Sequence, residues 1–474
     1  MKKILLCLFA ITLVITVFAG TEVEKGKSSK PNIIIVNFDD MGYGDLGITG
    51  ATGYQTPQMD QLAKEGTFFS QFYSAQAVCS ASRAGLLTGC YPNRIGFSGA
   101  LDHTSKTGIN PDETTLAEML KSNGYTTAAF GKWHLGHLTP FLPTHQGFDY
   151  FYGIPYSHDM VPNHPNVKNY YPPLPLIEGE KTIETNPDST KFTTTFTEST
   201  VAFIKEHKNK PFFVYLAHPL PHVPMAVSSK FKGKSAQGLY GDVIMELDWS
   251  IGQIRQTLKA LKLEENTLLI VTSDNGPWLN YGNHAGSAGG LREGKGTSWE
   301  GGQRVPCLMA WKGVVPAGAV MNQLASEIDL LPTIAAITKA ELPKNKIDGV
   351  NILPLLKGDA KAQPRKQFLY YYRANNLEAV RNEQYKLVFP HPGRTYEGFA
   401  PGKDGVPGKA NENFAFEGGL FDLRRDPGER YDLSKSLPDV VEQLTKIANE
   451  AREDLGDVLT NHPGKNRRAP GKAQ

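Results

Sequence analysis

The chain has 474 residues, 40% hydrophobic and 10% aromatic, which is enough to bury a large core in one big domain and a smaller one. Its formal net charge is +2 and includes Lys2 and Lys3, so it falls to about zero if the N-terminal segment is removed. Bulk charge therefore gives no case for binding nucleic acid or an anionic membrane surface.

Residues 1–19 have the pattern of a secretory signal peptide. Two lysines precede an apolar run of about fifteen residues, and the run ends in small residues that suit cleavage. A membrane anchor is the weaker alternative, because the run is short for a bilayer and polar chain follows at once. We therefore expect an exported protein, periplasmic or secreted, with no membrane span after cleavage and a linker over residues 20–30.

Four apolar, β-branched runs end abruptly in polar side chains, at residues 31–38, 125–130, 211–217 and 266–273. Such runs are typical of strands buried on both faces of a parallel sheet. Helical patterns lie between them, at residues 56–66, 113–124 and 241–261. This alternation predicts a doubly wound, mostly parallel α/β sheet, in which ligands bind beyond the carboxyl ends of the strands.

The pattern changes near residue 360, where short runs typical of antiparallel strands are followed by a helical pattern at 438–454. We expect a catalytic domain over 31–360 and a smaller α+β subdomain over 361–457. Residues 390–419 form a connection that is long for a compact domain, so it is either mobile or a binding loop. The basic, apolar-poor segment 458–474 is predicted to be disordered.

Cys79, Cys90 and Cys307 remain once the signal peptide is removed, and an odd count indicates that one thiol is not structural. A Cys90–Cys307 disulfide and two buried free thiols both fit the sequence. Cys79 stands four residues before Arg83, so the two side chains share a face if the segment is helical. On spacing alone, a buried cysteine with a surface arginine is the best-supported interpretation.

Oxygen ligands follow two of the predicted strands: Asp39 and Asp40 after the first, Asp274 and Asn275 after the last. Such a set selects calcium or magnesium over zinc. Aspartates at strand ends are often only turn or capping residues, and that alternative stays open.

Cationic and titratable side chains occupy the other predicted strand ends and a glycine-rich loop. Singly each fits a solvated lysine or a packed histidine, but together they describe a pocket for a tetrahedral anion. These residues are Lys132, His134, His222 and Lys295.

Seven motifs resemble the type I sulfatases of the alkaline phosphatase superfamily, most closely the arylsulfatase A and N-acetylgalactosamine-6-sulfatase branch. They occur in the family's order over roughly residues 30 to 435. The motifs are NFDDMGYGDLG, CSASRAGLLTG, GKWHLG, FLPTHQGFDYFYGIPYSHDM, SDNGP, REGKGTSWEGG and LFDLRRDPGERYDLS.

The resemblance implies that Cys79 is oxidised to formylglycine, whose hydrate is the nucleophile, and that the four oxygen ligands bind one Ca²⁺. It also implies that Arg83 and Lys132 hold formylglycine and sulfate and that His134 acts on the hydrate. Ser157, His222 and Lys295 match further active-site positions of the branch.

Ala81 stands where the usual motif has proline. This variant resembles sequences matured in bacteria by an anaerobic-type radical enzyme that uses S-adenosylmethionine, so that maturase is the expected partner.

The implied reaction is hydrolysis of a sulfate monoester, with a sulfated sugar as the expected substrate. A phosphate or phosphonate ester hydrolase of the same superfamily is the first alternative. A non-catalytic glycan binder with an unmodified thiol is the second. Candidates for sugar selection are His103, His284, Arg373 and the loop after Pro390.

Overall fold

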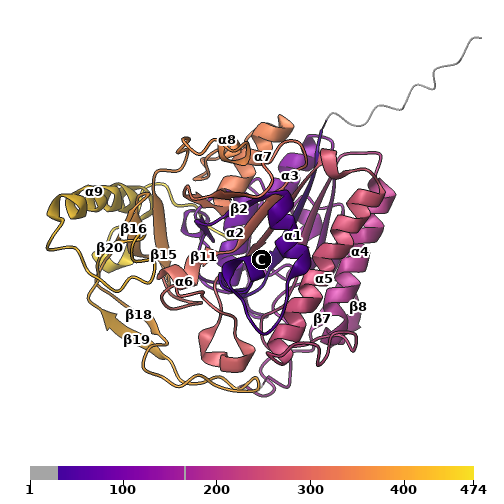
Figure 1. Cartoon of the computed structure of the whole chain (residues 1–474), viewed down its shortest axis with the longest axis horizontal. Helices are drawn as coiled ribbons and strands as arrows, with labels where there is room; N and C mark the ends of the chain where they lie inside the picture. The colour runs from indigo at the N-terminus through magenta and orange to yellow at the C-terminus, as the bar shows by residue number, and fades with distance from the viewer. Residues whose placement is uncertain (1–29, 165–166, 474) are drawn as a thin grey trace, which may run out of the picture.

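A computed structural model describes residues 30–164 and 167–473. The predicted signal peptide and nearly all of the predicted linker lie outside the described residues. A ten-stranded sheet with helices on both faces forms the larger part of the molecule (Figure 1). Its strand order is β13 (Ala319–Met321), β2 (Thr67–Phe69), β12 (Cys307–Ala310), β10 (Thr267–Ser273), β1 (Asn32–Phe38), β9 (Phe212–Ala217), β5 (Thr126–Lys132), β6 (Tyr150–Ile154), β7 (Pro175–Glu178) and β8 (Lys181–Thr185).

The four predicted strands form the centre of this sheet. β1 pairs in parallel with β10 on one side and β9 on the other, and β9 pairs in parallel with β5. Every residue of β1 and β10 is buried, as expected for apolar runs covered on both faces. The predicted mostly parallel α/β sheet is therefore confirmed.

Alternate residues of β1 enter two separate hydrophobic cores, because successive side chains on a strand point to opposite faces. Ile33 and Ile35 pack with helices α2 (Cys79–Thr88), α3 (Leu116–Ser122) and α7 (Leu330–Thr338). Ile34 and Val36 pack with helices α1 (Pro57–Glu65), α4 (Phe192–His207) and α5 (Leu239–Ala260). Two helical layers thus enclose the sheet.

Local sequence accounts for the ends of the predicted helices. α1 has a proline in its first turn, which suits a helix start. α3 begins with a capping box in which Thr115 and Glu118 each accept a backbone N–H from the other residue. The predicted helices at 56–66, 113–124 and 241–261 correspond to α1, α3 and α5.

A second sheet forms the C-terminal unit, as predicted. It is antiparallel, and α9 (Pro438–Leu455) packs on it through Leu444 and Ala448, which lie four residues apart on one helix face. The strands are β15 (Phe368–Tyr372), β16 (Asn376–Arg381), β17 (Tyr385–Val388) and β20 (Gly419–Asp422).

The long connection at 390–419 contains a two-stranded hairpin of β18 (His391–Thr395) and β19 (Asn411–Phe416). Smaller elements complete the fold: β3 (Phe72–Tyr73), β11 (Arg304–Val305), β14 (Ala325–Ser326), α6 (Glu300–Gln303) and α8 (Leu353–Leu356).

The segment after residue 457 differs from the prediction of a disordered tail. β21 (Gly471–Lys472) pairs with β4 (Thr107–Gly108) of the larger unit. Arg468 donates to both carboxylate oxygens of Glu113, at 2.5 and 2.9 Å, and Glu113 is buried. The prediction failed because the partner of this arginine lies 355 residues earlier in the chain.

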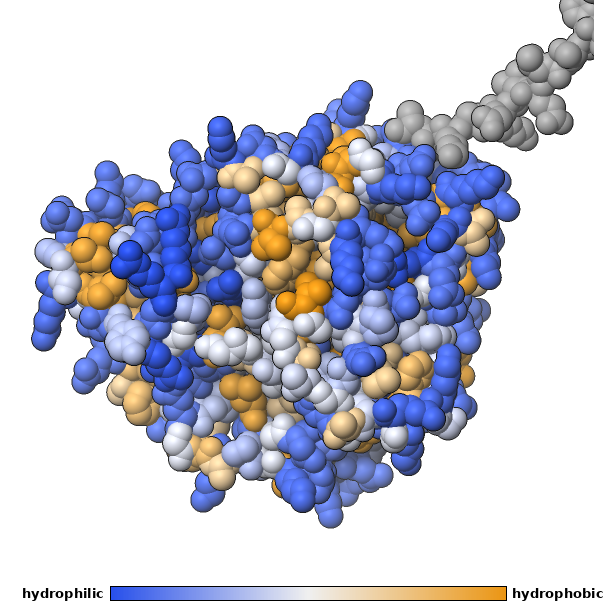
Figure 2. Space-filling model, viewed as in Figure 1, coloured by the Kyte–Doolittle hydropathy of each residue, from blue (hydrophilic) through white to orange (hydrophobic). Residues whose placement is uncertain are grey.

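The three cysteines of the described residues are all buried and free, so Cys90 and Cys307 form no disulfide in this structure. None of the helices among the described residues is long and apolar enough to cross a membrane. Figure 2 shows hydrophilic side chains over much of the visible face, with smaller groups of apolar side chains between them.

Candidate active site

The predicted oxygen ligands form one cluster at the carboxyl edge of the large sheet. Phe38 and Ser273, the last residues of β1 and β10, are paired, so the residues that follow them emerge side by side. The Asp40 N–H lies 3.2 Å from Asp274 Oδ1, and Asn275 Nδ2 donates to Asp40 Oδ1 at 2.7 Å.

Three cationic side chains surround these oxygens. Lys132, the last residue of β5, places its ammonium nitrogen 2.6 Å from Asp39 Oδ2. Lys295 Nζ lies 2.7 Å from Asp40 Oδ1. Arg83 donates from Nε and Nη2 to Asp274 Oδ2, at 2.9 and 2.7 Å. Each carboxylate thus has a different cation as its closest partner, and Arg83 Nη2 also lies 3.7 Å from Asp39 Oδ1.

Arg83 is completely buried, so the interpretation of a surface arginine beside Cys79 is wrong. Its Nη1 also donates to the Lys132 carbonyl at 3.0 Å, which ties α2 to the end of β5. Spacing fixes which helix face a residue occupies, but not what that face packs against, and every residue of α2 is buried.

Cys79 is the first residue of α2, and only 3% of it is exposed. It packs with Val78, Ala81 and Tyr372. Burial raises the pKa of its thiol, and the positive charges of Lys132 and nearby groups only partly oppose this effect. An unmodified Cys79 thus stays protonated and is a poor nucleophile, because only the thiolate is reactive.

The oxygen cluster fits a hard cation. Asp39 Oδ1 and Asn275 Oδ1 are buried without a hydrogen-bond partner among the described residues. Such orphaned acceptors are costly, and a cation would satisfy both. Asp39, Asp40 and His222 also offer ligand atoms that lie within 4.8 Å of one another.

The pKa values of Asp39 and Asp274 also favour a bound cation. Burial opposes ionisation of Asp39, but the charges of Lys132, His222 and Arg83 outweigh it and hold its pKa well below the usual range. Burial, aided by the negative charge of Asp39, raises the pKa of Asp274 to about 7. A dication bound beside Asp274 would favour its ionised form, because a nearby positive charge offsets the cost of burying the carboxylate.

His134 has the geometry of a neutral base. Its Nε2 lies 2.6 Å from the Leu101 carbonyl, to which it donates, so Nδ1 carries the lone pair. That Nδ1 atom is buried with no hydrogen-bond partner in the described part of the chain. Burial, reinforced by the charge of Lys132, lowers the pKa of His134 well below 6.5.

His222 and Ser157 border the same cluster. His222 Nδ1 contacts the Val223 carbonyl at 2.5 Å, and its Nε2 lies 3.6 Å from Asp40 Oδ2. Both ring nitrogens of His222 thus face oxygen atoms. Ser157 Oγ accepts a hydrogen bond from Lys132 Nζ at 3.2 Å.

The other predicted substrate-binding residues make no hydrogen bond to this cluster within the described part of the chain. The ring of His103 packs edge to face on Tyr170, with centroids 5.0 Å apart. Arg373 donates to Asn413 of β19 at 3.1 Å. His284 ends a short 3₁₀ helix, and burial lowers its pKa. Of this predicted set, Ser157 is the member bonded to the cluster.

Asp159 is a site neighbour that the sequence reasoning missed, although it lies in a quoted motif two residues after Ser157. Burial opposes its ionisation, but the charges of His222, His158 and Lys132 lower its pKa. Its Oδ1 atom is buried without a hydrogen-bond partner among the described residues. The motif alone could have identified it, because the match covers this position too.

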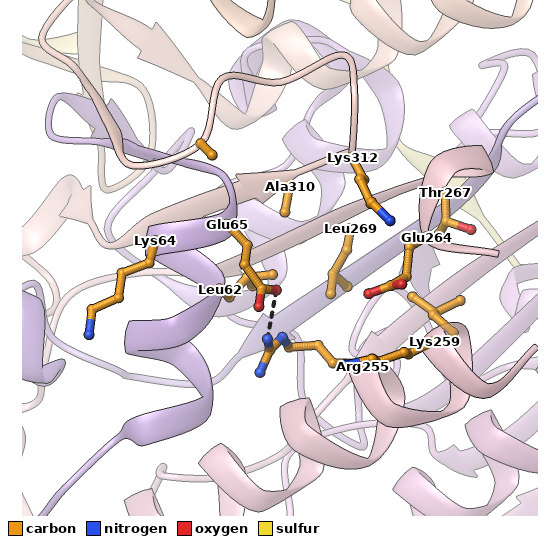
Figure 3. A pocket seen from close by; sticks show the side chains of 12 residues that line it. Leu62, Lys64, Glu65, Arg255, Lys259, Glu264, Thr267, Leu269, Ala310 and Lys312 are labelled. Atoms are coloured by element: carbon orange, nitrogen blue, oxygen red, sulfur yellow. Dashed lines mark hydrogen bonds and ion pairs between the residues drawn. The ribbon is translucent and has the colours of Figure 1, made fainter. Parts of the chain in front are cut away.

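A cavity of about 410 Å³ lies at the opposite edge of the sheet, beside Thr267 at the start of β10. Figure 3 shows the Arg255–Glu65 ion pair, 2.6 Å long, across this cavity. Lys64 and Lys259 border it from the last turns of α1 and α5, where cations complement the helix dipole. Lys64 and Lys259 thus have a structural explanation, and we assign the cavity no role in the chemistry.

Comparisons with known proteins agree with this geometry. The family model described as Sulfatase matches residues 31–340, and that described as the C-terminal region of aryl-sulfatase matches residues 364–467. A third, described as N-sulphoglucosamine sulphohydrolase, C-terminal, matches residues 294–397.

Curated relatives match over nearly the whole chain. Arylsulfatase A of Bos taurus is 39% identical over 468 residues, covering 93% of this chain and 89% of the relative. N-acetylgalactosamine-6-sulfatase of Mus musculus is 36% identical over 485 residues, covering 95% and 91%. A solved structure described under "Metabolism of multiple glycosaminoglycans by bacteroides thetaiotaomicron" is 29% identical with a TM-score of 0.77, covering 90% of this chain and 100% of that one.

The fold and the site together define a hydrolase with the alkaline-phosphatase-like α/β architecture. The chain belongs to the sulfatase family, and it is a sulfuric ester hydrolase.

Proposed function

We propose that the enzyme removes O-sulfate groups from a carbohydrate, with formylglycine made from Cys79 as its nucleophile. The observation that carries the mechanism is the placement of Cys79 at the start of a buried helix, next to cations and oxygen ligands at the carboxyl edge of the sheet. The sugar preference is supported by relatives named for N-acetylgalactosamine 6-sulfate and for glycosaminoglycan metabolism.

Asp39, Asp40, Asp274 and Asn275 would hold one Ca²⁺, as their unsatisfied oxygens and oxygen-only donor set indicate. When bound, the ion would polarise the sulfuryl oxygens and offset the charge that develops on them. Lys132, Lys295 and Arg83 add fixed positive charge around the same oxygens, in a buried site where such interactions are strong.

Formylglycine at position 79 would supply an aldehyde hydrate, with one hydroxyl for attack on sulfur and a second whose deprotonation releases sulfate. His134 is suited to take that proton, because it is neutral and its Nδ1 is free to accept. His222 or Lys295 would donate a proton to the leaving alcohol. Ser157 orients Lys132 through their hydrogen bond.

Maturation of Cys79 is proposed to use the anaerobic-type radical enzyme, because Ala81 replaces the usual proline. Co-expression with each class of maturase, followed by mass spectrometry of the Cys79 peptide, tests this proposal. Full conversion by the aerobic enzyme alone would refute it. The N-terminal sequence supports export to the periplasm or the medium.

The hydrolytic proposal is tested with Cys79→Ala. The variant should fold with an unchanged melting temperature and lose hydrolysis of an aryl sulfate, whereas Cys90→Ala should keep it. Retained activity in Cys79→Ala would refute the formylglycine mechanism. Preferential turnover of a phosphate or phosphonate ester would favour the alternative substrate class.

The carbohydrate proposal needs its own experiment. Defined sulfated mono- and disaccharides, including N-acetylgalactosamine 6-sulfate, should be desulfated by the wild-type enzyme. An enzyme that cleaves aryl sulfates but none of these sugars would contradict the sugar preference. Wild-type protein that binds sulfated sugar and carries no aldehyde at position 79 would instead be a glycan binder.

A further inference from the structure

The main chain at Lys295 is anchored from three directions. The Lys295 N–H donates to the Pro277 carbonyl at 2.9 Å, and the Gly296 N–H donates to the Ala77 carbonyl at 2.8 Å. The Lys295 carbonyl accepts a hydrogen bond of 2.5 Å from the Tyr396 hydroxyl. The first two anchors belong to the segments that carry the metal ligands and Cys79, whereas the third comes from the C-terminal unit.

Tyr396 is itself fixed by Glu293, two residues before Lys295. The Tyr396 N–H donates to Glu293 Oε2 at 2.9 Å, and Thr395 Oγ1 donates to Oε1 at 2.5 Å. Glu293 is buried and has a positive φ of 58°, a conformation that non-glycine residues adopt at a cost. Tyr396, the residue after β18, is therefore hydrogen-bonded to the Lys295 loop through both its backbone N–H and its hydroxyl group.

The Lys295–Gly296 main chain is packed closely against the C-terminal unit and has little room to move. A Cβ atom on Gly296 would lie 2.8 Å from Arg394 Nη1 and 3.1 Å from the Tyr372 hydroxyl. The Lys295 side chain is 7% exposed, and its ammonium nitrogen lies 4.5 Å from the centre of the Trp278 ring. A displaced main chain would therefore displace the ammonium group, because the packed side chain has little freedom to compensate.

We infer that Tyr396 and Glu293 are positioning residues, which fix the Lys295 main chain so that its ammonium group meets the reacting sulfate. This inference rests on the proposed role of Lys295 in sulfate ester hydrolysis. Through Tyr396, the C-terminal unit thus helps to form the catalytic site.

The test compares Tyr396→Phe with Tyr431→Phe, whose side chain belongs to a residue that is 73% exposed. Loss of the Tyr396 hydroxyl should lower kcat for an aryl sulfate about tenfold, with KM, aldehyde content and melting temperature nearly unchanged. Tyr431→Phe should match the wild type. An unchanged kcat in Tyr396→Phe would overturn the inference.

A double-mutant cycle shows whether the effect passes through Lys295. In a Lys295→Ala background, Tyr396→Phe should change kcat by less than about twofold, because the group that it positions is absent. Glu293→Ala should show the same dependence. A tenfold loss in both backgrounds would overturn the inference, since the hydroxyl would then act elsewhere.

An activity-independent measurement separates this inference from the proposed function. Hydrogen exchange at the Gly296 amide should be faster in Tyr396→Phe than in the wild type, even if the wild type turned over no aryl sulfate. Absence of turnover would then refute the proposed function, whereas an unchanged exchange rate would refute the anchoring.

Discussion

Removal of divalent cations should destabilise the folded enzyme. Asp39 Oδ1 and Asn275 Oδ1 are buried without hydrogen-bond partners among the described residues, and an unsatisfied buried acceptor costs about 1–3 kcal/mol. Two such atoms give a loss of about 2–6 kcal/mol in the free energy of unfolding. For a chain of this length, 1 kcal/mol corresponds to about 1 °C in the melting temperature, so chelation should lower it by about 2–6 °C.

The assay is thermal unfolding of chelated enzyme, with and without about 1 mM Ca²⁺ or Mg²⁺. Asn275→Ala should lose most of the calcium response, whereas Asn283→Ala, at an exposed position, should keep it. A melting temperature that does not change on chelation would refute the reasoning about orphaned oxygens. Full recovery with Mg²⁺ but not with Ca²⁺ would refute the choice of calcium.

Three further changes test other parts of the structure. Lys132→Met should lower kcat for an aryl sulfate by about 10²–10³, because it removes a buried charge from the reacting oxygens. The control Lys64→Met should leave kcat unchanged, and a loss below tenfold in Lys132→Met would contradict the expected role of Lys132. Arg468→Ala should cost about 1–2 kcal/mol in urea unfolding, because it leaves Glu113 buried without its cation; equal stability would mean that the tail contact is weak. Burial raises the pKa of the Asp248 carboxyl to about 6, so the folded state binds this proton more tightly than the unfolded state does. The free energy of unfolding therefore falls as the pH rises from about 4 to 6. The stability of Asp248→Asn relative to the wild type should therefore increase by about 2–3 kcal/mol over that interval, and a constant difference would contradict the shift.

Much of the fold was predictable because the central strands are buried on both faces. A strand such as β1, with every residue buried, must be apolar along its whole length, so its end is visible where Asp39 and Asp40 begin. The same reasoning located Asp274 and Asn275 after β10. Parallel strands end at one edge of the sheet, and that places polar side chains from distant segments in the same region.

Strand order and long-range partners were not predictable in this way. The hydrogen bond between Asn275 and Asp40 joins residues 235 apart, and no local pattern says that β1 and β10 are neighbours. The burial of Arg83 depends on Asp274, 191 residues away, and the ordering of Arg468 depends on Glu113. Spacing and composition describe one segment of the chain, whereas these contacts depend on which distant segments pack against it in the folded protein.

Backbone conformation explains how two successive aspartates serve one site. Neighbouring residues on a strand point to opposite faces, so an extended chain would separate the carboxylates of Asp39 and Asp40. Asp40 has a φ of 66°, in the left-handed region, which turns the chain just after β1. His134 has a φ of 60° at the corresponding place after β5. Non-glycine residues in this region cost about 1–2 kcal/mol each and persist only where surrounding contacts hold them. At Asp40 those contacts are Lys295, Asn275 and the Asp274 carboxylate, so the ion pairs of the site also hold the backbone shape that the site requires.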